Sequence, residues 1–132
     1  MTANIPDDRL FSAEHEWLKL EVDSALMGIS DHAQHALGDV VYVELPAVGR
    51  EISRGLAIGV VESVKAVSDI YAPVSGVITA INHEVLEHPD LINKDPYGQG
   101  WLLKIALKNS SESLKYLLSA YDYRDLLTKE AK

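Results

Sequence analysis

The chain has 132 residues, of which 47% are hydrophobic and 24% charged, so it is long enough and apolar enough to fold around one modest core. It contains no cysteine, which excludes disulfides, thiolate catalysis and cysteine-bound zinc or iron–sulfur centres. Its formal net charge of −8 disfavours nucleic acid as a partner, because an acidic surface repels phosphate.

The sequence also predicts neither a membrane-spanning segment nor a targeting segment. No apolar run is long enough for a transmembrane helix, and the start MTANIPDDRLFSAEHEW has the features of neither a signal peptide nor a transit peptide. We therefore expect a protein without membrane partners that stays where it is made, in a bacterial cytoplasm rather than a mitochondrial matrix.

Short β-strands are predicted along most of the chain, where β-branched and aromatic residues are frequent. They cover residues 15–22, 25–30, 40–45, 56–64, 77–82 and 101–107. Gly59 lies inside one of these strands and predicts a bulge or a close backbone approach. A short helix is expected over residues 31–37, capped by Ser30 or Asp31 and ended by Gly38.

Two further segments differ from this pattern. Residues 83–100 contain two prolines and two glycines, which predicts a loop with one helical turn at about 89–93. From Ser113 onward leucines recur at helical spacing, which predicts a C-terminal helical segment over about 111–128. Together these elements indicate a mainly β protein, one domain over residues 1–132 with a small sandwich or flattened barrel at about 10–108.

Lys65 is the only lysine or arginine between Arg54 and Lys94. It falls between two predicted strands, at or beside the tip of a hairpin, with Val64 and Ala66 as neighbours. An exposed lysine near acidic residues is a poor nucleophile, because catalytic lysines need burial or a cationic neighbour. Spacing alone leaves two interpretations open: an ordinary solvated lysine, or a lysine presented to an enzyme that modifies it.

Five blocks of the sequence carry a family resemblance. They are VESVKAVSDIYAPVSG (61–76), EHEW (14–17), GISDHAQ (28–34), LGDVVYVELPAVG (37–49) and INKDPYGQGWLLKI (92–105). The first resembles the lipoyl-attachment segment of the glycine cleavage system H protein family, and the other four are similar to further segments of that family. The resemblance spans about residues 10–127. It implies a barrel-sandwich hybrid of two small sheets, like that of lipoyl domains, with the modified lysine on a hairpin turn.

The resemblance implies a non-catalytic carrier with lipoic acid in amide linkage on Lys65. In this family the arm takes an aminomethyl group from glycine decarboxylase, a pyridoxal-phosphate enzyme, and delivers it to a tetrahydrofolate-dependent aminomethyltransferase. Dihydrolipoamide dehydrogenase, an FAD enzyme, then reoxidises the arm, and lipoyl- or octanoyl-attaching enzymes install it. We expect the chain to work with these partners as a monomer.

The resemblance also implies residues around the arm. The attachment-motif residues near the lysine are Glu62, Ser63, Val64, Ala66 and Ser68. Glu16 and Asp69 match family positions and are expected to cradle the loaded arm, because the carried amine is cationic and carboxylates are its natural partners. For each, a solvated carboxylate or a turn cap is the alternative, and for Asp69 in particular an Asx turn. Met27, in place of a smaller residue, and His35, in place of an acidic one, depart from the family pattern.

The same residues admit other functions. An H-like protein that relays lipoyl groups to other enzymes is the nearest alternative. Biotinyl domains usually have Met on both sides of the lysine, and lipoyl domains of 2-oxo acid dehydrogenases usually have Asp before it, whereas this chain has Val64 and Ala66. An unmodified interaction module is the alternative from another class.

The remaining candidates predict no further chemistry. His32 and His35 lie three apart on the predicted helix, but no third ligand stands at a recognisable spacing, so we expect solvated side chains and no metal site. Trp17 and Trp101 lie in predicted strands and are expected in the core.

Overall fold

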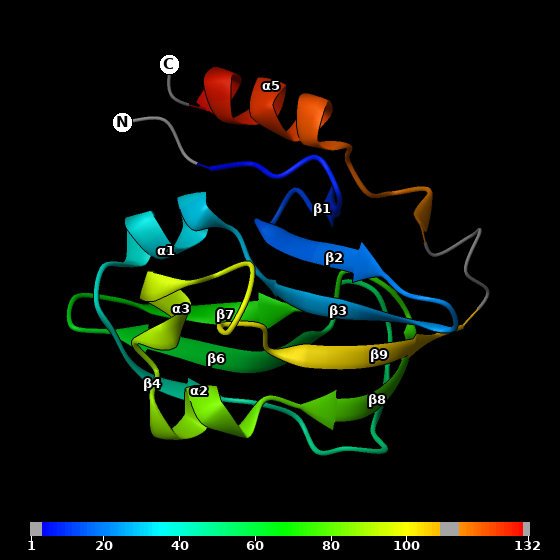
Figure 1. Ribbon diagram of the computed structural model, residues 1–132, viewed down its shortest axis with the longest axis horizontal. Helices are drawn as coiled ribbons and strands as arrows, with labels where there is room; N and C mark the ends of the chain where they lie inside the picture. Colours follow the sequence, from blue (N-terminus) through cyan, green and yellow to red (C-terminus); the bar gives the residue numbers. More distant parts are fainter. Residues whose placement is uncertain (1–3, 109–113, 131–132) are drawn as a thin grey trace.

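The computed structural model describes residues 4–108 and 114–130, which form two β-sheets flanked by short helices (Figure 1). The strands are β1 (Leu10–Phe11), β2 (Glu16–Leu20), β3 (Ser24–Ile29), β4 (Val40–Glu44), β5 (Glu51–Ile52), β6 (Ala57–Ser63), β7 (Val67–Tyr71), β8 (Gly76–Ile81) and β9 (Leu103–Leu107). The helices are α1 (Asp31–Leu37), α2 (His83–Glu87), α3 (Leu91–Lys94) and α5 (Ala120–Glu130). None of these helices is both long and apolar enough to cross a membrane.

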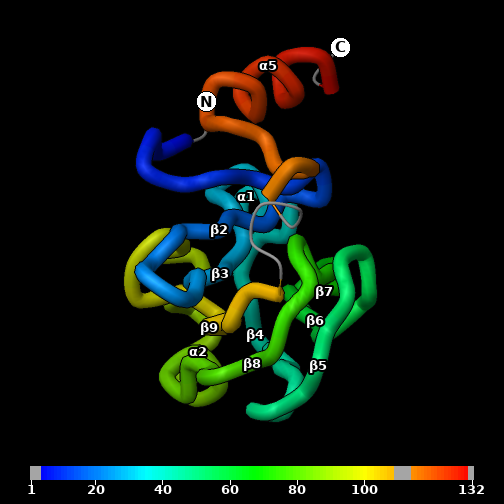
Figure 2. Tube along the Cα trace, turned by 90° about the vertical axis from the view of Figure 1, so that its right-hand side faces the viewer, coloured from blue at the N-terminus to red at the C-terminus, as the bar shows by residue number. Residues whose placement is uncertain are grey.

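The two sheets are antiparallel and pack face to face. One has six strands in the order β1-β2-β3-β9-β8-β5, and the other has three in the order β4-β6-β7. Figure 2 shows β2, β3 and β9 on one side of the molecule and β6 and β7 on the other. The main core includes residues of both sheets, among them Leu18, Met27, Ile78, Ile105, Val43, Val61 and Ile70. This arrangement confirms the expected mainly β, barrel-sandwich fold.

All six predicted strands are present, with ends that differ by a few residues. In β3, for example, the alternate residues Ala25, Met27 and Ile29 are buried in the core, as expected for a strand with one face toward the core. Met27, the departure from the family pattern, is thus a fully buried core residue. Gly59 lies at a register shift between β6 and β7, which confirms the predicted bulge. A Cβ at this position would collide with the Glu44 carbonyl oxygen, so the predicted close backbone approach is present as well.

Residues 83–100 are more regular than predicted. Two helices, α2 and α3, replace the expected loop, and the turn predicted at 89–93 is found as α3 (Leu91–Lys94). The Asn82 side chain caps α2 by accepting a hydrogen bond from Glu84 N–H at 3.1 Å, and Val85 is fully buried. The sequence did not predict α2, because Pro89 follows this helix closely and proline is typical of loops.

The C-terminal helix begins later than predicted. Leu118 pairs with Phe11 through two backbone hydrogen bonds of 2.7 and 2.8 Å, so the chain is extended there and α5 starts only at Ala120. The part of the prediction that covers residues 111–113 lies outside the described residues. Tyr123 of α5 stacks on Phe11 with ring centroids 4.4 Å apart, in a second apolar cluster that includes the buried Trp17. Trp101, predicted in a strand, precedes β9 and is half-buried against this cluster.

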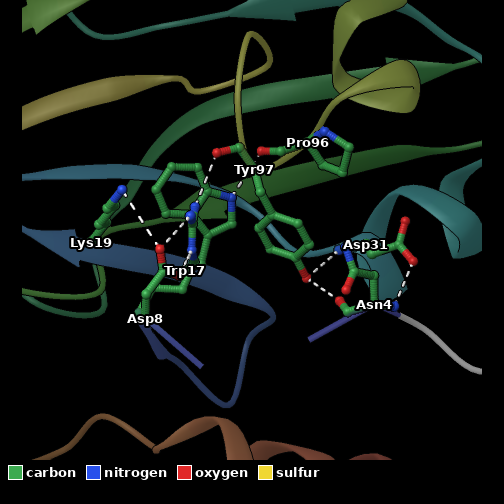
Figure 3. Close-up of polar contacts among 8 residues, drawn as sticks. Asn4, Asp8, Trp17, Lys19, Asp31, Pro96 and Tyr97 are labelled. Carbon is green, nitrogen blue, oxygen red and sulfur yellow. Dashed lines mark hydrogen bonds and ion pairs between the residues drawn. The ribbon is translucent and has the colours of Figure 1, made fainter. Parts of the chain in front are cut away.

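The segment around Tyr97 joins the N-terminal residues to β2 and α1 (Figure 3). The Trp17 indole N–H donates to the Pro96 carbonyl at 3.0 Å. The Tyr97 hydroxyl accepts from Asp31 N–H at 3.0 Å and donates to the Asn4 carbonyl at 2.6 Å. These contacts fix the position of β2 relative to α1, the two elements between which the candidate site lies.

Candidate functional site

Lys65 lies on the tight turn between β6 and β7, which projects beneath α1 at the left of Figure 1. The Ser63 hydroxyl accepts hydrogen bonds from the N–H groups of Lys65 at 3.3 Å and Ala66 at 3.0 Å, and Val64 N–H donates to the Asp39 carbonyl at 3.1 Å. The Lys65 side chain is exposed and forms no ion pair within residues 4–108 and 114–130. The backbone of the turn is therefore fixed, while its lysine is accessible.

A groove of about 280 Å³ lies between α1, the start of β2 and strands β6 and β7. Its polar lining consists of Glu14, His15, Glu16, His32, Ser68 and Asp69. Its apolar lining consists of Ile29, Ala33, Ala36, Leu37, Val61 and Ile70. The Lys65 side chain reaches the end of α1, since its Cε lies 3.3 Å from the position that a Cβ on Gly38 would take. An apolar groove with three carboxylates suits a ligand that has an alkyl part and a cationic end.

Glu16, on β2, is almost completely buried, which sets aside the interpretation as a solvated carboxylate. The Ser12 hydroxyl donates to it at 2.5 Å and Tyr71 N–H at 3.4 Å. Burial raises the pKa of Glu16 from 4.5 to about 7, because the charged form loses water, and these two hydrogen bonds only partly oppose the rise. No lysine or arginine forms an ion pair with this carboxylate among the described residues. With a pKa of about 7, Glu16 has both its protonated and its ionised form populated near neutral pH.

Asp69, on β7, lies in the wall of the same groove and is exposed. It pairs with Val60 inside the β6–β7 ladder, so it is a strand residue and no Asx turn is formed there. The structure therefore brings Glu16 and Asp69 to one groove from strands 53 positions apart in the sequence.

The other motif residues surround the lysine in different ways. Ser63 is buried and holds the turn, Glu62 is half-buried on β6, and Ser68 lines the groove. Val64, 70% exposed, and Ala66 flank Lys65. Further exposed apolar side chains of the same sheet are Val67, Val41 and Tyr42. The lysine thus stands among exposed apolar side chains, with acidic residues nearby.

Sequence reasoning missed several residues of this site. Ser12, which donates to Glu16, precedes it by four residues in a loop, and no motif marks that spacing. Tyr71 contributes only its backbone N–H, which no residue type signals. His15 and His32 also line the groove, although the sequence grouped His32 with His35 as solvated helix residues. His35 instead lies 3.5 Å from the Asp31 carboxylate.

Comparisons with known proteins agree with this architecture. The family model for the glycine cleavage H-protein matches residues 9–130. A glycine cleavage system H protein of Carboxydothermus hydrogenoformans is 52% identical over 128 residues, which are 97% of this chain and 98% of that protein. One from Thermus thermophilus is 50% identical over 128 residues, or 97% and 99% of the two chains.

A solved structure is similar as well. The crystal structure of a glycine cleavage system H protein from Mycobacterium marinum matches with a TM-score of 0.85 and 39% sequence identity, over 92% of this chain and 97% of that one. The resemblance seen in five sequence blocks is thereby confirmed. The chain belongs to the glycine cleavage H-protein family.

Proposed function

We propose that Lys65 carries a lipoyl group in amide linkage and that the groove beside it holds the loaded end of the arm. As a member of the H-protein family, the chain is a carrier component of the glycine cleavage system and not an enzyme itself. The observation that supports the attachment site best is the position of Lys65, exposed on a fixed turn and next to a groove lined by carboxylates.

A lipoyl group fits the chemistry of this chain. When bound, it supplies the dithiol that a cysteine-free chain lacks, and with it the sulfur that carries an aminomethyl group. Amide formation at Nζ removes the charge of Lys65. The carboxylates of the groove are then left to a cation at the end of the arm.

Glu16 and Asp69 have distinct tasks in this proposal. Asp69 is exposed and offers a charged group at the surface, whereas Glu16 is buried and has a pKa of about 7. An ammonium group in the groove favours the ionised form of Glu16, so the residue gives up its proton as the cation binds. The apolar groove wall keeps water from the amine and slows its hydrolysis.

The proposed partners are the enzymes that load, unload and reoxidise the lipoyl arm. Glycine decarboxylase, the tetrahydrofolate-dependent aminomethyltransferase and dihydrolipoamide dehydrogenase meet the arm in turn, in the bacterial cytoplasm. A lipoyl- or octanoyl-attaching enzyme meets the turn itself. The exposed Val64, Val67 and Tyr42 give this enzyme an apolar surface beside Lys65.

The intact mass of the protein tests the attachment site. The purified chain is incubated with a lipoate-attaching enzyme, lipoate and ATP, and its mass is measured. We expect one lipoyl increment on the natural chain, none on Lys65→Arg, and one on the control Lys94→Arg, which removes another exposed lysine. An increment on Lys65→Arg would place the attachment elsewhere and overturn the proposal.

The lifetime of the loaded protein tests the groove separately. Hydrolysis adds water to the aminomethyl group and releases formaldehyde and ammonia, so formaldehyde reports the loss. We expect Glu16→Gln and Asp69→Asn to accept the lipoyl group normally and to release formaldehyde several-fold faster. The control Glu51→Gln changes an exposed carboxylate on β5, outside the groove, and should match the natural chain. Equal rates in all four proteins would rule out the cradle and leave the attachment site untouched.

A further inference from the structure

Three side chains from distant parts of the chain lie close together, and two of them also line the groove. They are His15, in the turn before β2, His32 on α1, and Glu130, the last residue of α5. Figures 1 and 2 show α5 at the same end of the molecule as α1. One ligand atom from each of the three lies within 4.8 Å of the others, and His15 Nε2 is 3.4 Å from Glu130 Oε1. Both histidines are half-buried and Glu130 is exposed.

The position of the His15 ring is fixed by its backbone conformation and by a hydrogen bond to Tyr123. Its backbone has a φ of 73°, in the left-handed region that residues other than glycine seldom adopt. Its Nδ1 lies 2.8 Å from the Tyr123 hydroxyl, which in turn lies 2.7 Å from the Ser30 hydroxyl. When Nδ1 carries the proton, Tyr123 accepts from it and donates to Ser30, and the unprotonated Nε2, 3.4 Å from Glu130 Oε1, can bind a metal ion. Histidines that bind metals are oriented by this kind of hydrogen bond on the other ring nitrogen.

An ion pair between His15 and Glu130 does not account for the whole cluster. The ring of His32 lies against that of His15, with centroids 4.7 Å apart, and the two histidines come from different elements. Two imidazoles and a carboxylate around one point form the donor set of a transition-metal site, whereas Mg²⁺ and Ca²⁺ prefer oxygen ligands alone.

We propose that His15, His32 and Glu130 bind one divalent transition-metal ion, with Zn²⁺ as the best match. Ligand atoms of a tetrahedral Zn²⁺ site lie about 3.4 Å apart, given bonds of about 2.0–2.1 Å. The separation of His15 Nε2 from Glu130 Oε1 already has this value. His32 then has to move closer, so that its ring nitrogen reaches the same separation from His15 and Glu130.

The site would keep one coordination position open. Three protein ligands leave a fourth position of the tetrahedron for water or another group, as in catalytic rather than structural zinc sites. His15 and His32 also line the groove with Glu16 and Asp69, so this position lies beside the groove. The bound ion would also join α5 to α1 and to the start of β2, and so hold the C-terminal helix on the body of the protein.

Metal titrations of the full chain with unmodified Lys65 test the site. After removal of metal with EDTA, Co²⁺ is added as a spectroscopic probe and Zn²⁺ binding is measured by calorimetry. The variants are His32→Ala and Glu130→Gln, and the control is His35→Ala, which removes an exposed histidine from the same helix. The chain has five histidines and no cysteine, so few competing sites exist. Circular dichroism of each metal-free variant verifies its fold.

We expect one Zn²⁺ per chain, visible Co²⁺ absorption bands typical of four or five ligands, and a higher thermal midpoint with Zn²⁺. His32→Ala should weaken binding by tenfold or more and Glu130→Gln by several-fold, while His35→Ala should leave it unchanged. Equal weakening by His35→Ala, or affinity in His32→Ala equal to that of the natural chain, would overturn the proposal and mark the binding as non-specific.

Discussion

The burial of Glu16 predicts that this protein loses stability as the pH rises through neutrality. The pKa of Glu16 is about 7 in the folded chain against 4.5 ordinarily, and its side chain is almost completely buried. Because the folded-state pKa is raised, the protonated form is favoured by folding. The contribution of Glu16 to the free energy of unfolding is therefore fully present below pH 4.5 and disappears as the pH rises through 7.

The size of the effect follows from the two pKa values. The difference between about 7 and 4.5 corresponds to about 3 kcal/mol, at roughly 1.4 kcal/mol per pH unit. Glu16→Gln is the matched perturbation, since a neutral amide of the same shape can accept from Tyr71 N–H through its oxygen and donate to the Ser12 hydroxyl through its NH2 group. We expect Glu16→Gln to equal the natural chain near pH 4.5 and to exceed it by up to about 3 kcal/mol above pH 8.

Urea unfolding of both proteins from about pH 4.5 to 8.5, in buffer with EDTA, measures this difference directly. Subtracting the two curves removes the contributions of the other titrating groups, which both chains share. Parallel curves would refute the reasoning, because they would show that Glu16 has the same pKa folded and unfolded. The expected difference would show that the buried carboxylate of Glu16 destabilises the folded protein when it is ionised.

Three other substitutions give simple outcomes. Gly28→Ala should destabilise the protein by about 1–3 kcal/mol in urea unfolding, because the new Cβ would lie 2.7 Å from the buried Trp17 indole, and a loss under about 0.5 kcal/mol would show that the indole moves freely. Tyr123→Phe should cost about 1–2 kcal/mol by the same measurement, since the hydroxyl contacts both Ser30 and His15, and an unchanged value would mean that these hydrogen bonds contribute nothing net. Lys65→Arg should keep the thermal midpoint of the natural chain, because the side chain is exposed and forms no ion pair with the described residues, whereas a lower midpoint would give Lys65 a structural task.

The parts of the fold that could be predicted are those set by local pattern. Runs of β-branched and aromatic residues predicted six strands, and Ser30 and Gly38 marked the ends of α1, where the structure shows the Ser30 hydroxyl accepting from Ala33 N–H. The parts that could not be predicted depend on distant partners. Leu118 leaves the helical pattern because it pairs with Phe11, 107 residues away, and this pairing outweighs helix propensity.

The same distinction holds for the site. Lys65, the proposed attachment site, and its neighbours form a contiguous motif, so a resemblance could point to them. The burial of Glu16, its contact with the N–H of Tyr71, and the approach of His15 to His32 and Glu130 exist only in the folded chain. Sequence spacing suggested His32 with His35 instead, because helical neighbours are visible in a sequence and tertiary neighbours are not.

Tryptic peptide mapping after lipoate attachment tests the central claim most directly. Trypsin cuts after lysine and arginine but not after an acylated lysine, and Lys65 is the only such residue between Arg54 and Lys94. A chain acylated at Lys65 should yield one undivided peptide of residues 55–94 that carries the lipoyl mass. Efficient cleavage into 55–65 and 66–94, with the added mass on another peptide or on none, would contradict the account.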